Sequence, residues 1–444
     1  MYKAHNQGRE KKMSREQINV GVIGFGTVGV GAVQLLETNA DWIAQRVGSR
    51  VVVKRVMDVD WSRPRAYILR PEQQTTWVAD ILDDPEIDIV IEAVGGIKHA
   101  KDAVAGALTR RKSVVTPNKE LIAKHGAELL NLATEANVDL MFEGAVGGGI
   151  PIIRPLKESL AGDRILRLVG IVNGTTNFIL TAMSQEGRDF ADVLKDAQAH
   201  GYAEADPTAD VEGFDAMYKI AILSSIAYGS HIDVKKIYHE GITKITAADI
   251  EYAHQLGFEI KLLAVGARTA GGLDLRVHPA FVPMDHPLAS VNGVFNAIFV
   301  QGDPVGDLMF YGRGAGSGPT GSAVVGDVID CARNINHGAS GRVPCCCYQT
   351  LPIQPISEVV TGYYIRTCVL DRPGVVGKMA TIFGDHGVSL TSVFQPQQAE
   401  EEAGAAEVVW ITHRVQEAKL QAALKELAKL DVVEEIASVI RVEG

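Results

Sequence analysis

The chain of 444 residues has no excess of positive charge and no long apolar run. Its formal net charge is −11 and its charges are scattered, so the basic face that nucleic-acid binding needs is not expected. No apolar run reaches the roughly 18 residues of a membrane span, and no secretory signal is recognisable. These absences predict a cytoplasmic protein that acts on small molecules and binds neither nucleic acid nor a membrane.

The five cysteines have neither the spacing of a disulfide framework nor that of a zinc site. Three of them are adjacent, at Cys345, Cys346 and Cys347, in a stretch expected to be a linker. Adjacent thiols can chelate a soft metal, but no second Cys or His pair lies at ligand spacing. Incidental thiols in a reducing compartment are therefore the simpler interpretation.

The first half of the chain alternates short apolar strands with amphipathic helices. A polar, basic stretch comes first, so residues 1–17 are predicted to form a disordered tail. Residues 18–150 then predict an α/β fold with a doubly wound parallel sheet of the Rossmann type. A helix at about residues 318–340 is expected to pack back on this domain.

The second half predicts two further domains. Residues 151–317 have the pattern of an α+β domain built on one sheet. Residues 341–357 contain several prolines and read as a linker. Residues 358–444 follow the β-α-β-β-α-β order of a ferredoxin-like module. Because this last segment has no catalytic pattern, we expect it to be regulatory or dimerising.

A glycine-rich turn joins the first strand to the first helix. In that context the G-x-G-x-x-G pattern is typical of a dinucleotide-binding loop, whose pyrophosphate lies at the helix N-terminus. Asp58 ends the next strand, where a carboxylate binds the ribose of NAD, whereas Arg63 and Arg65 would suit the 2′-phosphate of NADP. Either cofactor is therefore expected. The loop consists of Gly24, Phe25, Gly26, Thr27, Val28 and Gly29.

Residues 201–219 concentrate carboxylates ahead of one lysine. Asp215 and Lys219 are four residues apart in an apolar-periodic run, so they share a helix face. A carboxylate cluster can hold an ammonium group, and a buried lysine can pass a proton near neutral pH. The alternative is that the acidic residues only favour the start of a helix, and that Asp215 and Lys219 form an ordinary surface ion pair. The other four carboxylates are Glu204, Asp206, Asp210 and Glu212.

Three other loops lie where ligands bind in α/β proteins. Lys119 follows a buried strand and could reach a cofactor or substrate oxygen, or simply begin a surface helix. The glycine run of residues 143–151 could coordinate a cation through its carbonyl groups, or form a hinge between domains. The glycine-rich residues 312–321 open a helix and offer a second contact for an anion or cofactor.

Several motifs together give the chain a specific resemblance to homoserine dehydrogenase, in the single-function form with a C-terminal ACT domain. They are the loop at Gly24, VTPNKELIA around Lys119, EGAVGGGIPII from Glu143, NGTTNFIL from Asn173, GYAEADPTADVEGFDAMYK from Gly201 and YYIRTCVLDRPGVVGKMATIF from Tyr363. The resemblance covers nearly everything after the tail. It implies reversible hydride transfer between NAD(P)H and aspartate 4-semialdehyde, which gives homoserine for threonine and methionine biosynthesis.

The resemblance also implies roles for individual residues. Lys219 resembles the catalytic acid/base, and Lys119 a residue that contacts cofactor or substrate. Residues 151–317 would bind substrate and dimerise, and residues 358–444 would be the ACT domain. The implied substrate ligands are Glu204, Asp210 and Asp215; Gly201 and Gly318 would border the cofactor; and Glu143, Val146, Gly148 and Ile150 would bind a sodium ion.

Three further expectations concern the cofactor, the effector and the number of subunits. Many relatives have Arg where this chain has Met57, so the preference between NAD and NADP is undetermined. Threonine is the expected effector at ACT interfaces, and a homodimer or homotetramer is expected because exposed sheets in such modules pair between subunits. Another NAD(P)-dependent amino-acid dehydrogenase, or a regulator without catalysis, remains the alternative.

Overall fold

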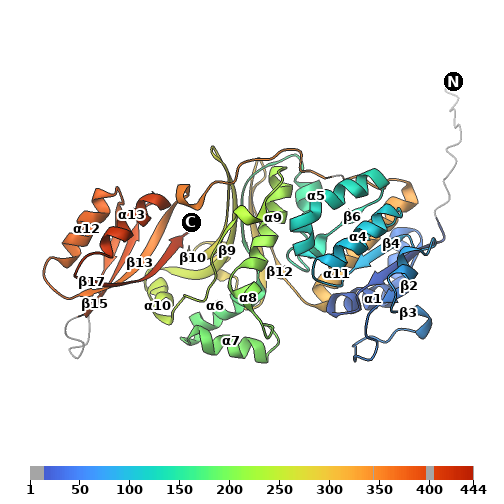
Figure 1. The fold of residues 1–444 in the computed structure, drawn as a ribbon, viewed down its shortest axis with the longest axis horizontal. Helices are drawn as coiled ribbons and strands as arrows, with labels where there is room; N and C mark the ends of the chain where they lie inside the picture. Colours follow the sequence, from blue (N-terminus) through green and yellow to red (C-terminus); the bar gives the residue numbers. More distant parts are fainter. Residues whose placement is uncertain (1–14, 344, 397–404, 444) are drawn as a thin grey trace, which may run out of the picture. The chain divides into compact units, whose positions relative to one another are not determined.

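The computed structural model describes residues 15–343, 345–396 and 405–443. The chain divides into two compact units, shown with their elements in Figure 1. The first unit comprises residues 1–149 and 315–345, and the second comprises residues 150–314 and 346–444. The predicted tail, residues 1–17, lies outside the described residues except at its end, where Gln17 already begins strand β1. No described helix is both long and apolar enough to cross a membrane.

The first unit is built on a six-stranded sheet whose paired strands are all parallel, as predicted. Apolar residues fill both of its faces, and Val20, Ile89 and Ile91 have no exposed surface. The strand order β3-β2-β1-β4-β5-β6 changes direction at β1 and β4, where ligands bind in folds of this kind. The strands are β1 (Gln17–Ile23), β2 (Arg50–Met57), β3 (Gln74–Thr75), β4 (Ile89–Glu92), β5 (Ser113–Val115) and β6 (Leu140–Met141).

Helix α11 (Ser317–His337) belongs to the first unit and packs against α1 (Thr27–Thr38). Two glycines allow this close approach: a Cβ added at Gly31 would lie 2.2 Å from the carbonyl oxygen of Ser317, and one at Gly321 would lie 2.9 Å from the carbonyl carbon of Gly31. The remaining helices of this unit are α2 (Ala40–Val47), α3 (Ala79–Leu82), α4 (Lys98–Thr109) and α5 (Lys119–Ala136).

The second unit contains one long mixed sheet in the order β12-β11-β7-β9-β10-β17-β13-β15-β14. Helices α6 and α9 pack on its first half. That half comprises β7 (Arg164–Ile171), β9 (Phe258–Thr269), β10 (Gly272–Pro283), β11 (Phe295–Asp303) and β12 (Gly306–Arg313), with β8 (Tyr238–His239) beside β10. Its helices are α6 (Gly174–Glu186), α7 (Phe190–Ala199), α8 (Thr208–Val211), α9 (Phe214–Tyr228) and α10 (Ala247–Gln255).

The C-terminal segment has the predicted ferredoxin-like order, with α12 and α13 over one face of its strands (Figure 1). Tyr363, Phe383 and Trp410 form its fully buried aromatic core. Its elements are β13 (Val360–Leu370), α12 (Val375–Asp385), β14 (Leu390–Phe394), β15 (Ala405–Thr412), β16 (Val415–Gln416), α13 (Glu417–Leu427) and β17 (Val433–Val442).

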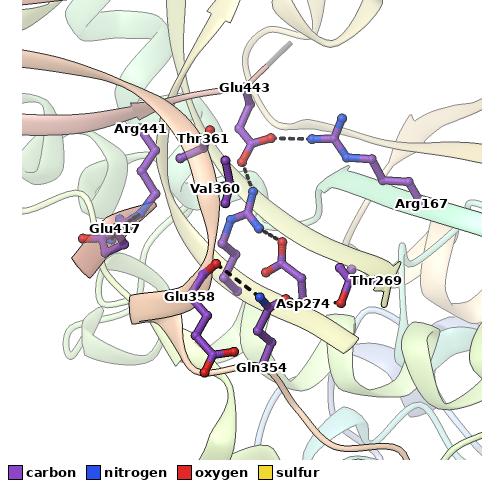
Figure 2. A network of polar contacts seen from close by, with 12 residues as sticks. Arg167, Thr269, Asp274, Gln354, Glu358, Val360, Thr361, Glu417, Arg441 and Glu443 are labelled. Atoms are coloured by element: carbon purple, nitrogen blue, oxygen red, sulfur yellow. Dashed lines mark hydrogen bonds and ion pairs between the residues drawn. The ribbon is translucent and has the colours of Figure 1, made fainter. Parts of the chain in front are cut away.

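The end of β17 joins this segment to the rest of the second unit. Residues 441 and 442 pair in parallel with residues 280 and 281 of β10, so the two predicted sheets are continuous. The Glu443 carboxylate then forms ion pairs with Arg276 of β10 and with Arg167 of β7, the second of which is drawn in Figure 2. The sequence did not predict this continuity, because the pairing depends on two residues far from β10 in the chain.

Near residue 312 the prediction from the sequence missed one strand and found the start of a helix. Strand β12 was not predicted, although it alternates exposed with half-buried residues as an edge strand does. Helix α11 begins at Ser317, next to the predicted start at about residue 318, so its first turns include Gly318 and Gly321 from the end of the glycine-rich stretch of residues 312–321. Glycine lowers helix propensity, but the close packing of α11 on α1 requires it at Gly321, where an added Cβ would lie 2.9 Å from the Gly31 carbonyl carbon.

Candidate active site

A buried lysine–carboxylate pair occupies the start of α9. Gly213 precedes the helix with φ +83°, a conformation that favours glycine. Asp215 lies in the first turn of the helix and Lys219 one turn later, and Asp215 Oδ2 lies 2.6 Å from Lys219 Nζ. The side chains are only 3% and 10% exposed, so the surface ion pair considered from the sequence is excluded. The predicted shared helix face is confirmed, and it faces the protein interior.

The junction of β7 with α6 completes this group. Lys219 Nζ donates to the carbonyl oxygen of Val172, at 2.6 Å. The carboxamide nitrogen of Asn173 donates to Asp215 Oδ2 at 2.9 Å and to Asp210 Oδ1 at 2.7 Å. Its oxygen accepts from the backbone N–H of Thr176 and so caps α6. We call these side chains the lysine cluster: Asn173, Asp210, Asp215 and Lys219.

Asn173 does more than cap a helix, because the cap uses the carboxamide oxygen and leaves the nitrogen to bridge two carboxylates. The NGTTN motif contained the information: Thr175, two residues on, also donates to Asp210, at 3.0 Å. The two polar side chains of this motif, Asn173 and Thr175, are the part of the sequence that could have indicated contacts with the carboxylate-rich residues 201–219.

The rest of residues 201–219 does not join the lysine cluster. Gly201 and Glu204 are exposed on the loop before α8, and Gly201 has φ +73°. Asp206 accepts from the backbone and hydroxyl of Thr208, and the hydroxyl bond is the main reason that the pKa of this exposed carboxyl is lowered. Glu212 Oε1 accepts from a threonine hydroxyl of the loop before α10. Of the five carboxylates, therefore, Asp210 and Asp215 gather around the lysine.

The dinucleotide-binding loop has the predicted conformation. Gly24 has φ +101°, and an added Cβ would lie 2.4 Å from the carbonyl oxygen of Ala93. At Gly29 an added Cβ would lie 2.1 Å from the carbonyl oxygen of Gly24. A Cβ at Gly26, by contrast, would meet nothing within 4 Å. In the described part of the chain no side chain caps the N-terminus of α1, so this open end fits a pyrophosphate.

Asp58 lies at the end of β2 beside this loop. It accepts from the backbone N–H of Phe25 and of Asp60, both at 3.0 Å, and pairs with Arg65 at 3.0 Å. Burial opposes ionisation of Asp58, but these bonds outweigh it, and the pKa of the carboxyl is lowered. A cavity of about 360 Å³ is lined by Gly26, Thr27, Asp58, Arg63, Arg65 and neighbouring residues. These residues fit the adenosine end of a dinucleotide.

Lys119 is the first residue of α5, directly after β5 and its loop, and is half-buried. The Asn118 side chain caps this helix by accepting from the backbone N–H of Leu121. The sequence placed Lys119 at a strand end, and the structure agrees.

The glycine run begins in a buried turn. Glu143 is 6% exposed, and its backbone N–H donates to Asp327 Oδ2 of α11 at 2.8 Å. Val146 follows the turn, and Gly147 and Gly148 have φ of +72° and +54°. No three His, Cys, Asp or Glu side chains among the described residues gather as a metal site. A cation here would need backbone oxygens, and a buried carboxylate beside left-handed glycines is compatible with one.

The parallel sheet with its glycine loop, together with the lysine cluster, defines an oxidoreductase that uses a nicotinamide dinucleotide. The chain belongs to the homoserine dehydrogenase family. It matches the family's NAD-binding domain over residues 24–143, its homoserine dehydrogenase domain over residues 151–329 and an ACT domain over residues 363–432. This confirms the resemblance found in the sequence and disfavours a regulator without catalysis.

Known relatives span nearly the whole chain. A homoserine dehydrogenase from Synechocystis is 46% identical over 436 residues, which is 96% of this chain and 99% of that protein. The crystal structure of a homoserine dehydrogenase from Thiobacillus denitrificans has a TM-score of 0.91 at 42% identity and covers 96% of this chain and 98% of its own. A hyperthermophilic archaeal homoserine dehydrogenase, solved with NADPH, has a TM-score of 0.59 at 29% identity, covering 71% of this chain and 97% of its own.

Proposed function

We propose that the lysine cluster catalyses the reversible reduction of aspartate 4-semialdehyde to homoserine with NAD(P)H. The observation that carries this proposal is the buried contact of Lys219 with Asp215 and the Val172 carbonyl oxygen. These contacts hold the ammonium group in one orientation. When bound, the dinucleotide supplies the hydride; Lys219 donates a proton to the substrate oxygen as its negative charge develops.

Asp210 and Asp215 are proposed to bind the ammonium group of the substrate, and Glu204 to join them from its exposed loop. The Asn173 bridge supports this role because it sets the positions of both carboxylates. Two carboxylates beside one lysine leave a net negative charge, which favours an amino-acid ammonium over a neutral alcohol. Gly201 is proposed to lie beside the cofactor from the same loop.

Replacing Lys219 tests the proposal. Lys219→Ala should lower kcat for homoserine oxidation by about 100-fold or more, the usual scale of lost acid/base catalysis. Lys195→Ala is the matched control, because Lys195 is 74% exposed on α7 and pairs with nearby Asp192. Turnover of Lys219→Ala within a few-fold of the control would show that another group transfers the proton. Lys119→Ala, assayed in parallel, tests the proposed role of the second lysine.

The cofactor is proposed to be NAD or NADP, bound by the loop from Gly24 and by Asp58. Lys119 and Gly318 would add contacts, and a sodium ion would bind at Glu143, Val146, Gly148 and Ile150. The NADPH bound to the archaeal relative supports NADP, whereas the ionised Asp58 supports NAD. Initial rates with NADH and with NADPH test the cofactor preference. Rates in sodium, potassium and choline buffers test the cation, and equal rates in all three would contradict the proposed sodium site.

The ACT domain is proposed to bind an amino-acid effector, threonine, in a homodimer or homotetramer. The family match over residues 363–432 supports amino-acid binding, and the sheet that joins this domain to β10 and β7 supports a coupling to catalysis. Homoserine oxidation should therefore fall as threonine is added, while isoleucine and methionine serve as comparison amino acids. Rates independent of threonine would refute this effector, and light scattering would give the oligomeric state.

A further inference from the structure

The last residue of β4, Glu92, has no exposed surface and no part in the chemistry considered so far. Its Oε2 accepts from the hydroxyl of Thr116 at 2.6 Å, and its Oε1 accepts from the backbone N–H of Val94 at 2.8 Å. Burial raises the pKa of Glu92, although bonds from these groups, from Gly95 and from the Asn118 side chain oppose that effect. A buried carboxylate is costly to a fold unless such bonds satisfy it.

These bonds connect two loops at the edge of the sheet where ligands bind. Val94 and Gly95 lie in the loop after β4, and Thr116 and Asn118 lie in the loop after β5. The Thr116 oxygen also accepts from the backbone N–H of Asn118, at 3.0 Å. The side-chain nitrogen of Asn118 donates to the carbonyl oxygen of Gly96, in the loop after β4, at 2.7 Å. Glu92 is therefore the common acceptor of a network that spans both loops.

The network extends to two groups assigned to the cofactor. Asn118 caps α5, and Lys119 is the first residue of that helix. The network therefore fixes the backbone position from which the Lys119 side chain extends. On the other side, Ala93 contacts the dinucleotide-binding loop so closely that a Cβ at Gly24 would lie 2.4 Å from its carbonyl oxygen. Any shift of the loop after β4 would therefore disturb the turn at Gly24.

We propose that Glu92 is a positioning residue for the dinucleotide: through Thr116 and Asn118 it fixes the loops after β4 and β5, and with them Lys119 and the turn at Gly24. The part that concerns Lys119 rests on the proposed function. The part that concerns dinucleotide affinity rests only on the nucleotide-binding fold and is measured without substrate.

The experiment compares variants of the full-length protein by NADPH fluorescence titration, thermal unfolding without ligand, and steady-state kinetics. Thr116→Val removes the hydroxyl donor with little change in volume, and Thr116→Ser retains it. Glu92→Gln retains the shape of the side chain but replaces one acceptor by a donor. Glu128→Gln is the matched control, because the Glu128 side chain is 54% exposed and pairs with Lys101 on the surface of the same unit.

Thr116→Val and Glu92→Gln should each weaken NADPH binding by about 10-fold or more, the scale of a lost hydrogen bond to a charged group. Thr116→Ser and Glu128→Gln should bind as the parent does. The double variant should lose little more affinity than the weaker-binding single variant, because both changes break one network. If kcat falls by the same factor in Thr116→Val and in Glu92→Gln, the network also positions Lys119.

Two results would overturn the inference. Single variants that unfold at lower temperature but bind NADPH with unchanged affinity would make Glu92 purely structural. Affinity losses that add fully in the double variant would mean that Glu92 and Thr116 act independently. If instead NADPH affinity falls as expected but the parent does not oxidise homoserine, the proposed function fails and the role of Glu92 in binding stands.

Discussion

The carboxamide nitrogen of Asn173 donates to Asp215 Oδ2 at 2.9 Å, the same oxygen that lies 2.6 Å from Lys219 Nζ. One side chain thus caps a helix, through its oxygen, and orients the carboxylate that pairs with the lysine. Because these two functions use different atoms, substitutions can separate them. The cap requires only an acceptor near the helix N-terminus, whereas the bridge requires a donor directed at the carboxylates.

Asn173→Ser should retain much of the cap and lose the bridge, while Asn173→Ala loses both. We expect kcat to fall in both variants, by about 10-fold for one lost bond to a charged group. The free energy of unfolding should fall further in Asn173→Ala, by about 1 kcal/mol for the cap. Steady-state kinetics and urea unfolding measure the two effects. If Asn173→Ser has the parent's kcat, the bridge does not orient Asp215 for catalysis.

Because His278 of β10 is buried, we expect the second unit to lose stability in acid. It has no exposed surface; its Nδ1 bonds to the Pro279 carbonyl oxygen, and Arg276 Nε bonds to its Nε2, so the ring is neutral. Burial, with the charges of Arg441 and Arg276, holds the pKa of His278 well below 6.5, and Glu443 at 3.7 Å does not reverse this. A depressed histidine pKa means that the unfolded chain binds the extra proton.

Stability should therefore be lost as pH falls below about 6.5, with a limiting slope of about 1.4 kcal/mol per pH unit from this group. His278→Gln should flatten the dependence between pH 7 and pH 5, and the comparison with the parent cancels the contribution of other histidines, including His286, whose pKa burial also lowers. Urea unfolding at several pH values measures this. Parallel profiles for variant and parent would contradict it.

The sequence predicted those features that depend on local pattern. The glycine turn at Gly24, the position of Asp58 and the shared face of Asp215 and Lys219 all follow from spacing along one strand or helix. The features it missed depend on contacts distant in the chain. The bridge from Asn173 to Asp215 joins two helices, and the pairing of β17 with β10 joins segments about 160 residues apart.

Alanine substitutions at two glycines, Gly26 before α1 and Gly31 within it, should affect different properties. A Cβ at Gly26 meets nothing within 4 Å, and its φ of −81° suits any residue, so Gly26→Ala should fold with the parent's stability. It should nevertheless bind NADPH at least about 10-fold more weakly, because the methyl occupies the space the pyrophosphate needs. Gly31→Ala, whose Cβ would lie 2.2 Å from the Ser317 carbonyl oxygen, should instead lower the melting temperature. Normal NADPH affinity in Gly26→Ala would place the pyrophosphate elsewhere.

The preference between NAD and NADP should depend on the charge of Asp58. The carboxylate stays ionised because its pKa is lowered, and it lies in the same cavity as Arg63 and Arg65. Since a 2′-phosphate is repelled by a carboxylate and attracted by a guanidinium, Asp58→Asn should shift the ratio of affinities towards NADP by about 10-fold. Arg63→Ala should shift it towards NAD, because Arg63 is 74% exposed and pairs only weakly with Asp60. Fluorescence titrations with NADH and NADPH give both ratios. Shifts in the same direction for the two variants would mean that the cavity does not hold the 2′ position of the ribose.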